Sequence, residues 1–319
     1  MNKVTKAVIG TAVAAGAVSF GAGYIIFNEV MNRDSLLYPK IADAAYKKMD
    51  HVDVSQEDER ITWYNTVEKQ YFEMINERNF RLKAKFIPAD KPSKKFVFCS
   101  HGYRSTGNGE YKLMAKFYHD MGMNLFIVDH QAAGESDGKY IGFGYHESKD
   151  SLKWLYWMLE KFGSDIEIIL QGVSMGCATV LMMSGDASLP ENVKFTVADC
   201  GYTSAYDQFE HILNNSMHLP NFPILYTSNI FNKALNGWDF RDADPINKVQ
   251  VAKVPILFIH GDKDDFVPTY MVHQLYAACS SEYKDLLVIP GAGHAESYPT
   301  DSAAYEAKVR EFADKFLSK

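Results

Sequence analysis

The stretch LQGVSMGCATV, from Leu170 to Val180, places a lone serine between two glycines. It follows apolar, β-forming residues and leads into small residues that suit a tightly packed helix. A sharp turn from strand to helix would hold the side chain of Ser174 at the carboxyl edge of a sheet, and Gly172 and Gly176 would avoid steric clashes there. The motif predicts a nucleophile elbow at Ser174; the alternative is a structural glycine turn with a helix-capping serine.

A serine hydroxyl is a weak nucleophile until a base removes its proton, so a histidine is expected at the same edge. The stretch VIPGAGHAES supplies His294, which follows the last apolar run and three turn-forming residues. The other nine histidines fit less well, because they fall in predicted helices, in irregular segments, or beside strand ends where they would order loops. His294 is therefore the predicted base.

The imidazole needs an acid that fixes its tautomer and stabilises its charged form. The stretch HGDKDDFVP offers Asp262, Asp264 and Asp265. We favour Asp264, because it lies beyond the tight turn and just before the next helix, whereas Asp262 would brace the turn and Asp265 would be solvated. Asp199, at the end of the run KFTVAD, stays open as a competitor, since its carboxylate would also lie at this edge.

Two backbone donors are expected to bind the negative charge that develops on the substrate oxygen during attack. The N–H group of Met175, directly after the serine, is the first candidate. The loop FCSHGYRSTGNG provides the second, the N–H group of Tyr103, while Arg104 in the same loop is expected to be solvated.

Short apolar runs alternate with amphipathic segments of helix length, which is typical of a parallel sheet covered on both faces. We therefore expect one doubly wound, mostly parallel α/β domain, with the hairpin of VEKQYFEMI and NFRLKAKFI at its edge. Residues 202–245 show no strand pattern and are rich in aromatic side chains, which predicts a helical lid inserted between two strands. The expected strands are KFVFCS, NLFIVD, IEIILQGV, KFTVAD, PILFIHG and DLLVIPG.

The composition excludes some functions. The net charge is -7 and lysine and arginine do not cluster, so the sequence offers no positively charged surface that would bind nucleic acid. The four cysteines have neither the spacing of a zinc site nor the density of a disulfide scaffold, so we expect them to be small buried apolar residues.

The amino terminus has a different composition. No charged residue occurs from Ala7 to Phe27, and Lys3 and Lys6 precede this run, which as a helix would match a bilayer core. We expect a membrane anchor with the following domain on the extracytoplasmic side; the alternative is a signal peptide and a secreted protein. The predicted organisation is an anchor or signal segment at 1–30, a helical stalk or covering segment at 31–66, and the α/β domain at 67–319.

From about Phe72 to the end, the chain resembles the α/β-hydrolase superfamily, and most closely a bacterial branch of esterases and serine aminopeptidase-like hydrolases. The resemblance rests on the order Ser174, Asp264, His294 and on the stretches SHGYRSTG, VDHQAAGESDG, VADCGYTS and DADPINKVQVAKVPILFIHGDKDDFVP. In the second stretch the family commonly has arginine and glycine where this chain has Gln131 and Ala132, a departure expected to affect a structural turn. The resemblance implies the fold, the triad and an acyl-serine mechanism without metal or organic cofactor.

These observations predict a membrane-anchored hydrolase of carboxylic esters that acts on a small acyl substrate. The lid side chains would either contact an apolar acyl group or only pack the lid onto the sheet. A serine peptidase stays open, with Asp207 or Glu210 binding a substrate amine, and so does a non-catalytic protein that binds an acyl ligand. The lid residues in question are Phe209, Leu213, Met217, Phe222 and Tyr226.

Overall fold

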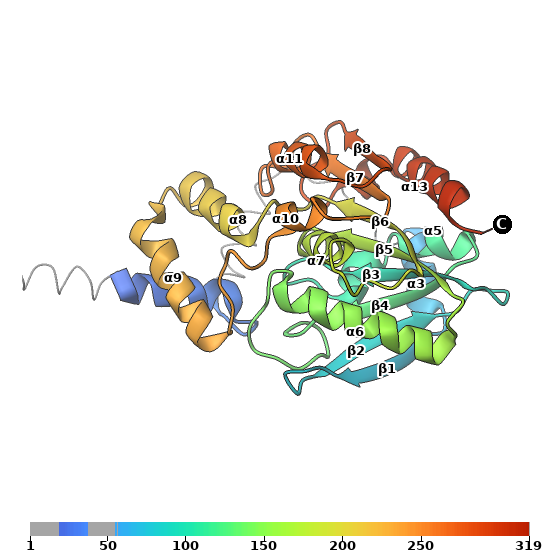
Figure 1. Cartoon of the computed structure of the whole chain (residues 1–319), viewed down its shortest axis with the longest axis horizontal. Coiled ribbons are helices and arrows are strands. Elements are labelled where there is room, and N and C mark those ends of the chain that lie inside the picture. Colours follow the sequence, from blue (N-terminus) through green and yellow to red (C-terminus); the bar gives the residue numbers. More distant parts are fainter. Residues whose placement is uncertain (1–18, 38–54, 56, 319) are drawn as a thin grey trace, which may run out of the picture.

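Eight strands form one mostly parallel sheet in the computed structural model, which describes residues 19–37, 55 and 57–318 (Figure 1). The order across the sheet is β1-β2-β4-β3-β5-β6-β7-β8. The predicted doubly wound α/β sheet is thus confirmed. The strands are β1 (Gln70–Ile75), β2 (Arg81–Ile87), β3 (Lys95–Ser100), β4 (Asn124–Asp129), β5 (Glu167–Val173), β6 (Val193–Asp199), β7 (Ile256–Gly261) and β8 (Lys284–Ile289).

The predicted edge hairpin supplies the antiparallel part of the sheet. Strand β1 pairs antiparallel with β2, and β2 pairs antiparallel with β4, whereas β3 to β8 run parallel. The turn between β1 and β2 is closed by the side chain of Asn76, whose Oδ1 accepts hydrogen bonds from the backbone N–H groups of Arg78 and Phe80. Asn79 takes the left-handed conformation that such a turn requires.

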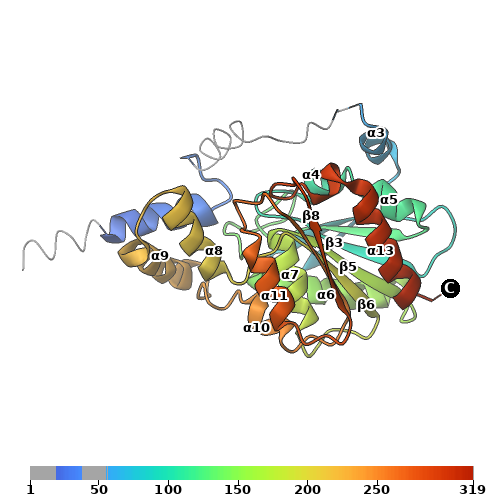
Figure 2. The ribbon, with the colours of Figure 1, turned by 90° about the horizontal axis from the view of Figure 1, so that it is seen from above.

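Helices cover both faces of the sheet (Figure 2). The side chains of successive strand residues point alternately into the two apolar layers between sheet and helices. Val97 and Ile169 point into the layer under one set of helices, whereas Phe98 and Leu170 point into the other. On the first face lie α3 (Glu59–Thr66), α4 (Gly107–Tyr111), α5 (Ala115–Asp120) and α13 (Ser302–Phe316); on the second lie α6 (Tyr145–Phe162), α7 (Met175–Ser184), α10 (Pro245–Val249) and α11 (Tyr270–Ala278). A short helix, α12 (Ser297–Thr300), precedes α13.

The segment between β6 and β7 is helical, and we keep the name lid for residues 202–245. It contains α8 (Ala205–His211), the π-helical turn η1 (Ile212–Ser216) and α9 (Asn221–Leu235). Phe209, Leu213 and Leu225 pack into an apolar cluster that also contains Met175, the first residue of α7. The lid therefore sits over the carboxyl edge of the sheet, at the point where α7 begins.

A helix over residues 19–31 packs along α9. Ser228 Oγ donates a hydrogen bond to the carbonyl oxygen of Gly23, and Phe27 and Met31 are buried in the same apolar cluster as the lid. Gly23 therefore lies against another helix of the same chain, a contact that the Ala/Gly-rich composition alone did not reveal.

The predicted membrane segment Ala7–Phe27 lies only partly within the structure, because residues 7–18 are outside the described part of the chain. Across the described ranges, 19–37 and 57–318, we find no helix with both the length and the apolar character to cross a bilayer. Of the predicted stalk at 31–66, residues 38–54 also lie outside. The helix α3 within it is capped by Asp58, whose side chain accepts from Arg60 N–H.

Two glycines of helix 19–31 give a matched test of its packing. We expect Gly23→Ala to loosen this helix by about 1–3 kcal/mol, because the new Cβ would overlap the Thr227 side chain and approach Ser228 N. Gly21→Ala meets nothing within 4 Å, so it should stabilise the helix by about 1 kcal/mol through its higher helix propensity. Amide hydrogen exchange over residues 19–31 measures both effects. Equal protection in the two variants would contradict the packing.

Candidate active site

Ser174 occupies a strained turn between β5 and α7. Its backbone has φ 56° and ψ -117°, a conformation that costs free energy for a residue other than glycine. A Cβ at Gly172 would overlap the carbonyl oxygen of Gly176, and a Cβ at Gly176 would overlap that of Ser100. The Ser174 N–H group donates to the Asp199 carbonyl oxygen at the end of β6, 2.9 Å away. The close approach of the surrounding backbone therefore holds the serine in this turn.

The structure brings Ser174, His294 and Asp264 together from three separate loops. Ser174 Oγ lies 2.9 Å from His294 Nε2, and His294 Nδ1 lies 2.7 Å from Asp264 Oδ2. Each loop follows the carboxyl end of a parallel strand, namely β5, β7 and β8. The two distances form one chain of hydrogen bonds from hydroxyl to carboxylate.

Asp264 is held in place by its own loop. Its Oδ1 accepts hydrogen bonds from the N–H groups of Phe266 and Val267, at 3.0 and 2.8 Å, so Oδ2 is directed at His294. The two neighbouring acids, Asp262 and Asp265, do not contact His294 in this way. Asp262 Oδ1 accepts from Gly291 N–H and so joins the loops after β7 and β8, while Asp265 is exposed.

Burial and mutual attraction set the charges of this pair. Burial alone would raise the pKa of Asp264, but the imidazoles of His294 and His260 hold that pKa well below its usual range. Burial alone would lower the pKa of His294, but the Asp264 carboxylate outweighs it and raises that pKa above its ordinary value of 6.5. The arrangement therefore favours an ionised Asp264 and an imidazole that readily takes a proton.

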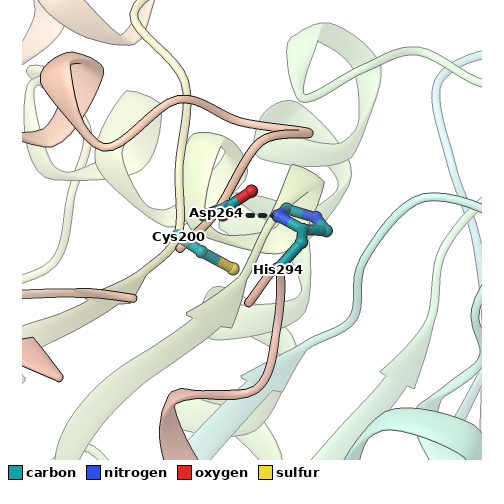
Figure 3. Close-up of side chains that lie close together, drawn as sticks. All are labelled: Cys200, Asp264 and His294. Atoms are coloured by element: carbon teal, nitrogen blue, oxygen red, sulfur yellow. Dashed lines mark hydrogen bonds and ion pairs between the residues drawn. The ribbon is translucent and has the colours of Figure 1, made fainter. Parts of the chain in front are cut away.

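Cys200 lies beside this pair (Figure 3). Its Sγ, a carboxylate oxygen of Asp264 and a ring nitrogen of His294 lie within 4.8 Å of one another, the spacing of a small metal site. Burial raises the pKa of the Cys200 thiol well above its usual range, so the thiol stays protonated and is a poor metal ligand. His294 Nδ1 is also already bonded to Asp264. The chemistry of these three groups fits a hydrogen-bonded acid and base better than a metal centre.

The loop after β3 approaches Ser174 from the other side. A Cβ at Gly102 would lie 3.4 Å from the Cβ of Ser174, so the backbone just before Tyr103 passes the serine closely. Met175 is the first residue of α7, and its N–H group has no partner within the helix ladder. Met175 thus follows the serine directly, and the residue before Tyr103 lies against it; the oxyanion-hole roles of their N–H groups stay a prediction.

Helix 19–31 binds this loop directly. Tyr103 donates its hydroxyl proton to the carbonyl oxygen of Val30. Arg104, expected to be a solvated loop residue, is half-buried and donates to the carbonyl oxygens of Glu29 and Asn32 and to Ser35 Oγ. These carbonyls belong to the end of the helix, where backbone acceptors lack helical partners. Arg104 is therefore a capping residue for a segment about seventy positions earlier.

Two further acids lie near His294, and sequence reasoning missed one of them, Glu110. Glu110 Oε2 accepts from Gly102 N–H at 3.2 Å, and burial raises its pKa. Asp199, the competitor for the acid role, instead accepts from Ser297 Oγ at 2.9 Å, and burial raises its pKa to about 7. Both carboxylates act electrostatically to raise the pKa of His294. The sequence held no local signal for Glu110, because it lies in the short helix after the loop that it braces.

The five lid residues named from the sequence divide into two groups. Phe209 and Leu213 are buried in the cluster that contains Met175. Met217, Phe222 and Tyr226 are exposed. Only the first group therefore packs in the cluster that joins the lid to the serine turn.

The departure at Gln131 and Ala132 falls in a turn after β4. Ala132 has φ 57°, in the left-handed region where glycine is favoured, which fits the glycine that the resemblance implies at this position. The Gln131 side chain accepts from Arg78 and donates to the Tyr140 carbonyl oxygen. The turn is thus held by a side chain instead of by glycine.

Comparisons with known proteins agree with this architecture. Residues 110–319 match the model of the prolyl oligopeptidase family. The chain is 29% identical to the uncharacterized protein YqkD of Bacillus subtilis, over 79% of this chain and 81% of that one. It is 24% identical to an uncharacterized membrane protein of Saccharomyces cerevisiae, over 97% and 96% of the two chains.

Solved structures show the same fold. An esterase of Pyrococcus furiosus is similar with a TM-score of 0.65 at 22% identity, covering 83% of this chain and 97% of that one. The mouse alpha/beta hydrolase domain-containing protein 10 gives 0.58 at 18% identity, covering 78% and 100%. The fold is that of the α/β-hydrolase superfamily.

The contact between Arg104 and helix 19–31 can be tested without an activity assay. We expect Arg104→Met to raise amide exchange over residues 29–37 and 103–106, because it removes charged hydrogen bonds worth about 1–3 kcal/mol together. The control is Arg241→Met, an exposed arginine that contacts Asp239 and the Tyr206 ring. Unchanged exchange over residues 29–37 in the first variant would show that Arg104 does not hold this segment.

Proposed function

Because the chain belongs to the prolyl oligopeptidase family, we propose that it is a serine hydrolase that cleaves carboxylic esters through an acyl-serine intermediate. The observation that carries this proposal is the continuous hydrogen-bond chain from Ser174 Oγ through His294 to Asp264, at 2.9 and 2.7 Å. The family match and the esterase-like fold support the hydrolase class, and this geometry supports the roles of the three residues.

In the proposed mechanism Ser174 Oγ attacks the ester carbonyl carbon while His294 Nε2 takes the hydroxyl proton. Asp264, ionised and fixed by two backbone donors, stabilises the imidazolium that forms. The N–H groups of Met175 and Tyr103 stabilise the negative oxygen of the tetrahedral intermediate. His294 then gives the proton to the leaving alcohol. A water molecule, deprotonated by the same imidazole, releases the acid and restores the serine.

The acyl group of the substrate is proposed to lie beneath the lid. Phe209 and Leu213 share an apolar cluster with Met175, the residue after the nucleophile. Phe143 packs edge-on against Phe209, with ring centroids 4.7 Å apart, and Tyr103 packs on Phe143. This apolar wall joins the lid to the oxyanion loop and supports an acyl group over a charged one.

A peptidase is the second candidate. A cavity of about 320 Å³ beside the lid is lined by Asp207 and Glu210 among other polar residues, and such carboxylates would attract a substrate ammonium group. His211, also in its lining, bonds the Asp265 carbonyl oxygen next to Asp264. Comparing turnover of aminoacyl arylamides with that of aryl esters separates the two: higher kcat/KM for the arylamide would favour the peptidase.

We propose that the protein is attached to a membrane by its amino-terminal segment, with the catalytic domain on the extracytoplasmic side. The uncharged run from Ala7 and the lysines before it support this, as does a membrane-protein relative that spans nearly the whole chain. Secretion after signal cleavage is the alternative. Cleavage near Gly23 would cut the helix that packs on α9, which favours the uncleaved form.

Ser174→Ala tests the nucleophile. We expect turnover of a short aryl ester to fall by on the order of a thousand-fold or more, because the acyl-serine cannot form. A fluorophosphonate should label the wild-type protein at Ser174 and leave this variant unlabelled. Ser184→Ala, a buried serine at the far end of α7, is the control. A wild-type protein that is not labelled and does not turn over the ester would favour a non-catalytic acyl-binding protein.

The pH profile tests the base. Only the neutral imidazole accepts a proton, so kcat/KM should fall as the pH drops through the pKa of His294, with a midpoint above 6.5 because Asp264 raises that pKa. Asp264→Asn should move the midpoint down and lower kcat/KM by on the order of a thousand-fold or more. Asp199→Asn, which keeps the contact with Ser297, should retain most activity. Equal losses in both variants would contradict the assignment of Asp264.

A further inference from the structure

The outer face of helix 19–31 is apolar. Phe20, Tyr24 and Ile25 are exposed, whereas Gly23 and Phe27 on the opposite side are buried against the protein. A surface helix of a soluble domain normally carries charged or polar residues on its solvent side. In residues 19–28 there is no aspartate, glutamate, lysine or arginine on any side. The helix thus has two apolar faces, and the rest of the protein covers only one of them.

The outer side of the lid has the same character. Residues 211–232 contain no aspartate, glutamate, lysine or arginine. Within them Phe222 is 76% exposed and Tyr226 is 62% exposed, with ring centroids 6.3 Å apart, and Met217 and Leu219 are exposed just before them. Phe222 and Tyr226 are not part of the buried cluster that contains Phe209 and Met175. They therefore contribute little to the packing of the lid onto the sheet.

These two apolar faces adjoin each other. Thr227 Oγ1 donates to the Ser19 carbonyl oxygen and Ser228 Oγ to that of Gly23. The Phe231 ring packs against Tyr24, with ring centroids 5.2 Å apart. Figures 1 and 2 both show helix 19–31 alongside α9 at the end of the molecule opposite the carboxyl terminus. We call the exposed residues Phe20, Tyr24, Ile25, Met217, Leu219, Phe222 and Tyr226 the apolar end face.

We propose that the apolar end face docks on the surface of a lipid bilayer. This goes beyond attachment by the amino-terminal segment, because it assigns membrane contact to the lid itself. Exposed apolar patches of this kind mark protein or membrane contacts, and phenylalanine and tyrosine suit the boundary between headgroups and acyl chains.

The sequence next to this face favours lipid as its occupant. Residues 7–18, which lead directly into helix 19–31, are uncharged and follow Lys3 and Lys6. With a helical rise of about 1.5 Å per residue, residues 7–18 would span about 18 Å, which is less than the ~30 Å core of a bilayer. The rest of the predicted span, residues 19–27, is packed on α9. A membrane that holds the whole span would therefore also meet the lid. The end face carries no acidic residue that anionic lipids would repel, although the chain as a whole has a net charge of -7.

A matched pair of labelled cysteines tests the proposal on the full chain. Tyr226→Cys lies on the end face, and Tyr71→Cys lies on the edge strand β1, with wild-type exposures of 62% and 64%. The four native cysteines are buried, so a thiol-reactive, environment-sensitive dye should label the introduced residue selectively. Vesicles of phosphatidylcholine and phosphatidylglycerol are added, with and without a quencher attached to the lipid acyl chains.

We expect a blue shift and a several-fold greater quenching at position 226 than at position 71. Equal responses at the two positions, or none at 226, would overturn the proposal. A blue shift that appears on raising the protein concentration without vesicles would also overturn it, because the face would then bind a second copy of the chain.

Charge substitutions provide a second readout. Phe222→Asp with Tyr226→Asp should lower the fraction of protein that floats with the vesicles several-fold, whereas Tyr71→Asp with Ile75→Asp should not. Both double variants should keep the thermal stability of the wild type, because all four side chains are exposed. Vesicle binding that is unchanged in the first variant would count against the end face even if ester hydrolysis by the protein is established.

Discussion

The backbone of α7 approaches the end of β3 so closely that no side chain fits between them. Gly176 lies against the carbonyl oxygen of Ser100, and Gly172 lies against Gly176 itself. This contact forces Ser174 into a left-handed backbone conformation at the edge of the sheet. A serine in an ordinary helix or strand would have its hydroxyl beside its own element. Here the turn directs it toward the loops that follow the other parallel strands.

Once the serine is placed, electrostatics decides which neighbours can act with it. Three carboxylates lie near His294: Asp264, Asp199 and Glu110. They differ in the hydrogen-bond donors and charges around them. Asp264 receives two backbone N–H groups and faces two imidazoles, which keep it charged despite its burial. Asp199 has one hydroxyl partner, and its pKa is raised to about 7. The strongest acceptor for the imidazole is thus the carboxylate with the most donors around it.

The lid, the loop after β3 and helix 19–31 form one connected unit. Arg104 and Tyr103 bind the end of the helix, Thr227 and Ser228 bind its beginning, and Phe27 and Met31 lie in the cluster that holds Met175. The segment that composition alone assigns to a membrane therefore touches the elements that surround Ser174. A displacement of the helix would therefore break hydrogen bonds to Tyr103 and Arg104, in the loop that approaches Ser174.

The sequence by itself predicted the sheet, because continuous apolar runs separated by amphipathic segments have few other arrangements. It also indicated that Ser174, Asp264 and His294 would meet, since each follows a parallel strand and the carboxyl ends of such strands gather at one edge. Only the tertiary structure showed the role of Arg104, the brace that Glu110 provides, the exposure of Phe222 and the docking of Gly23 on α9. Each depends on contacts between distant parts of the chain or on which face of a helix is covered. Local periodicity shows that a helix has an apolar side, but only the folded chain decides what that side meets.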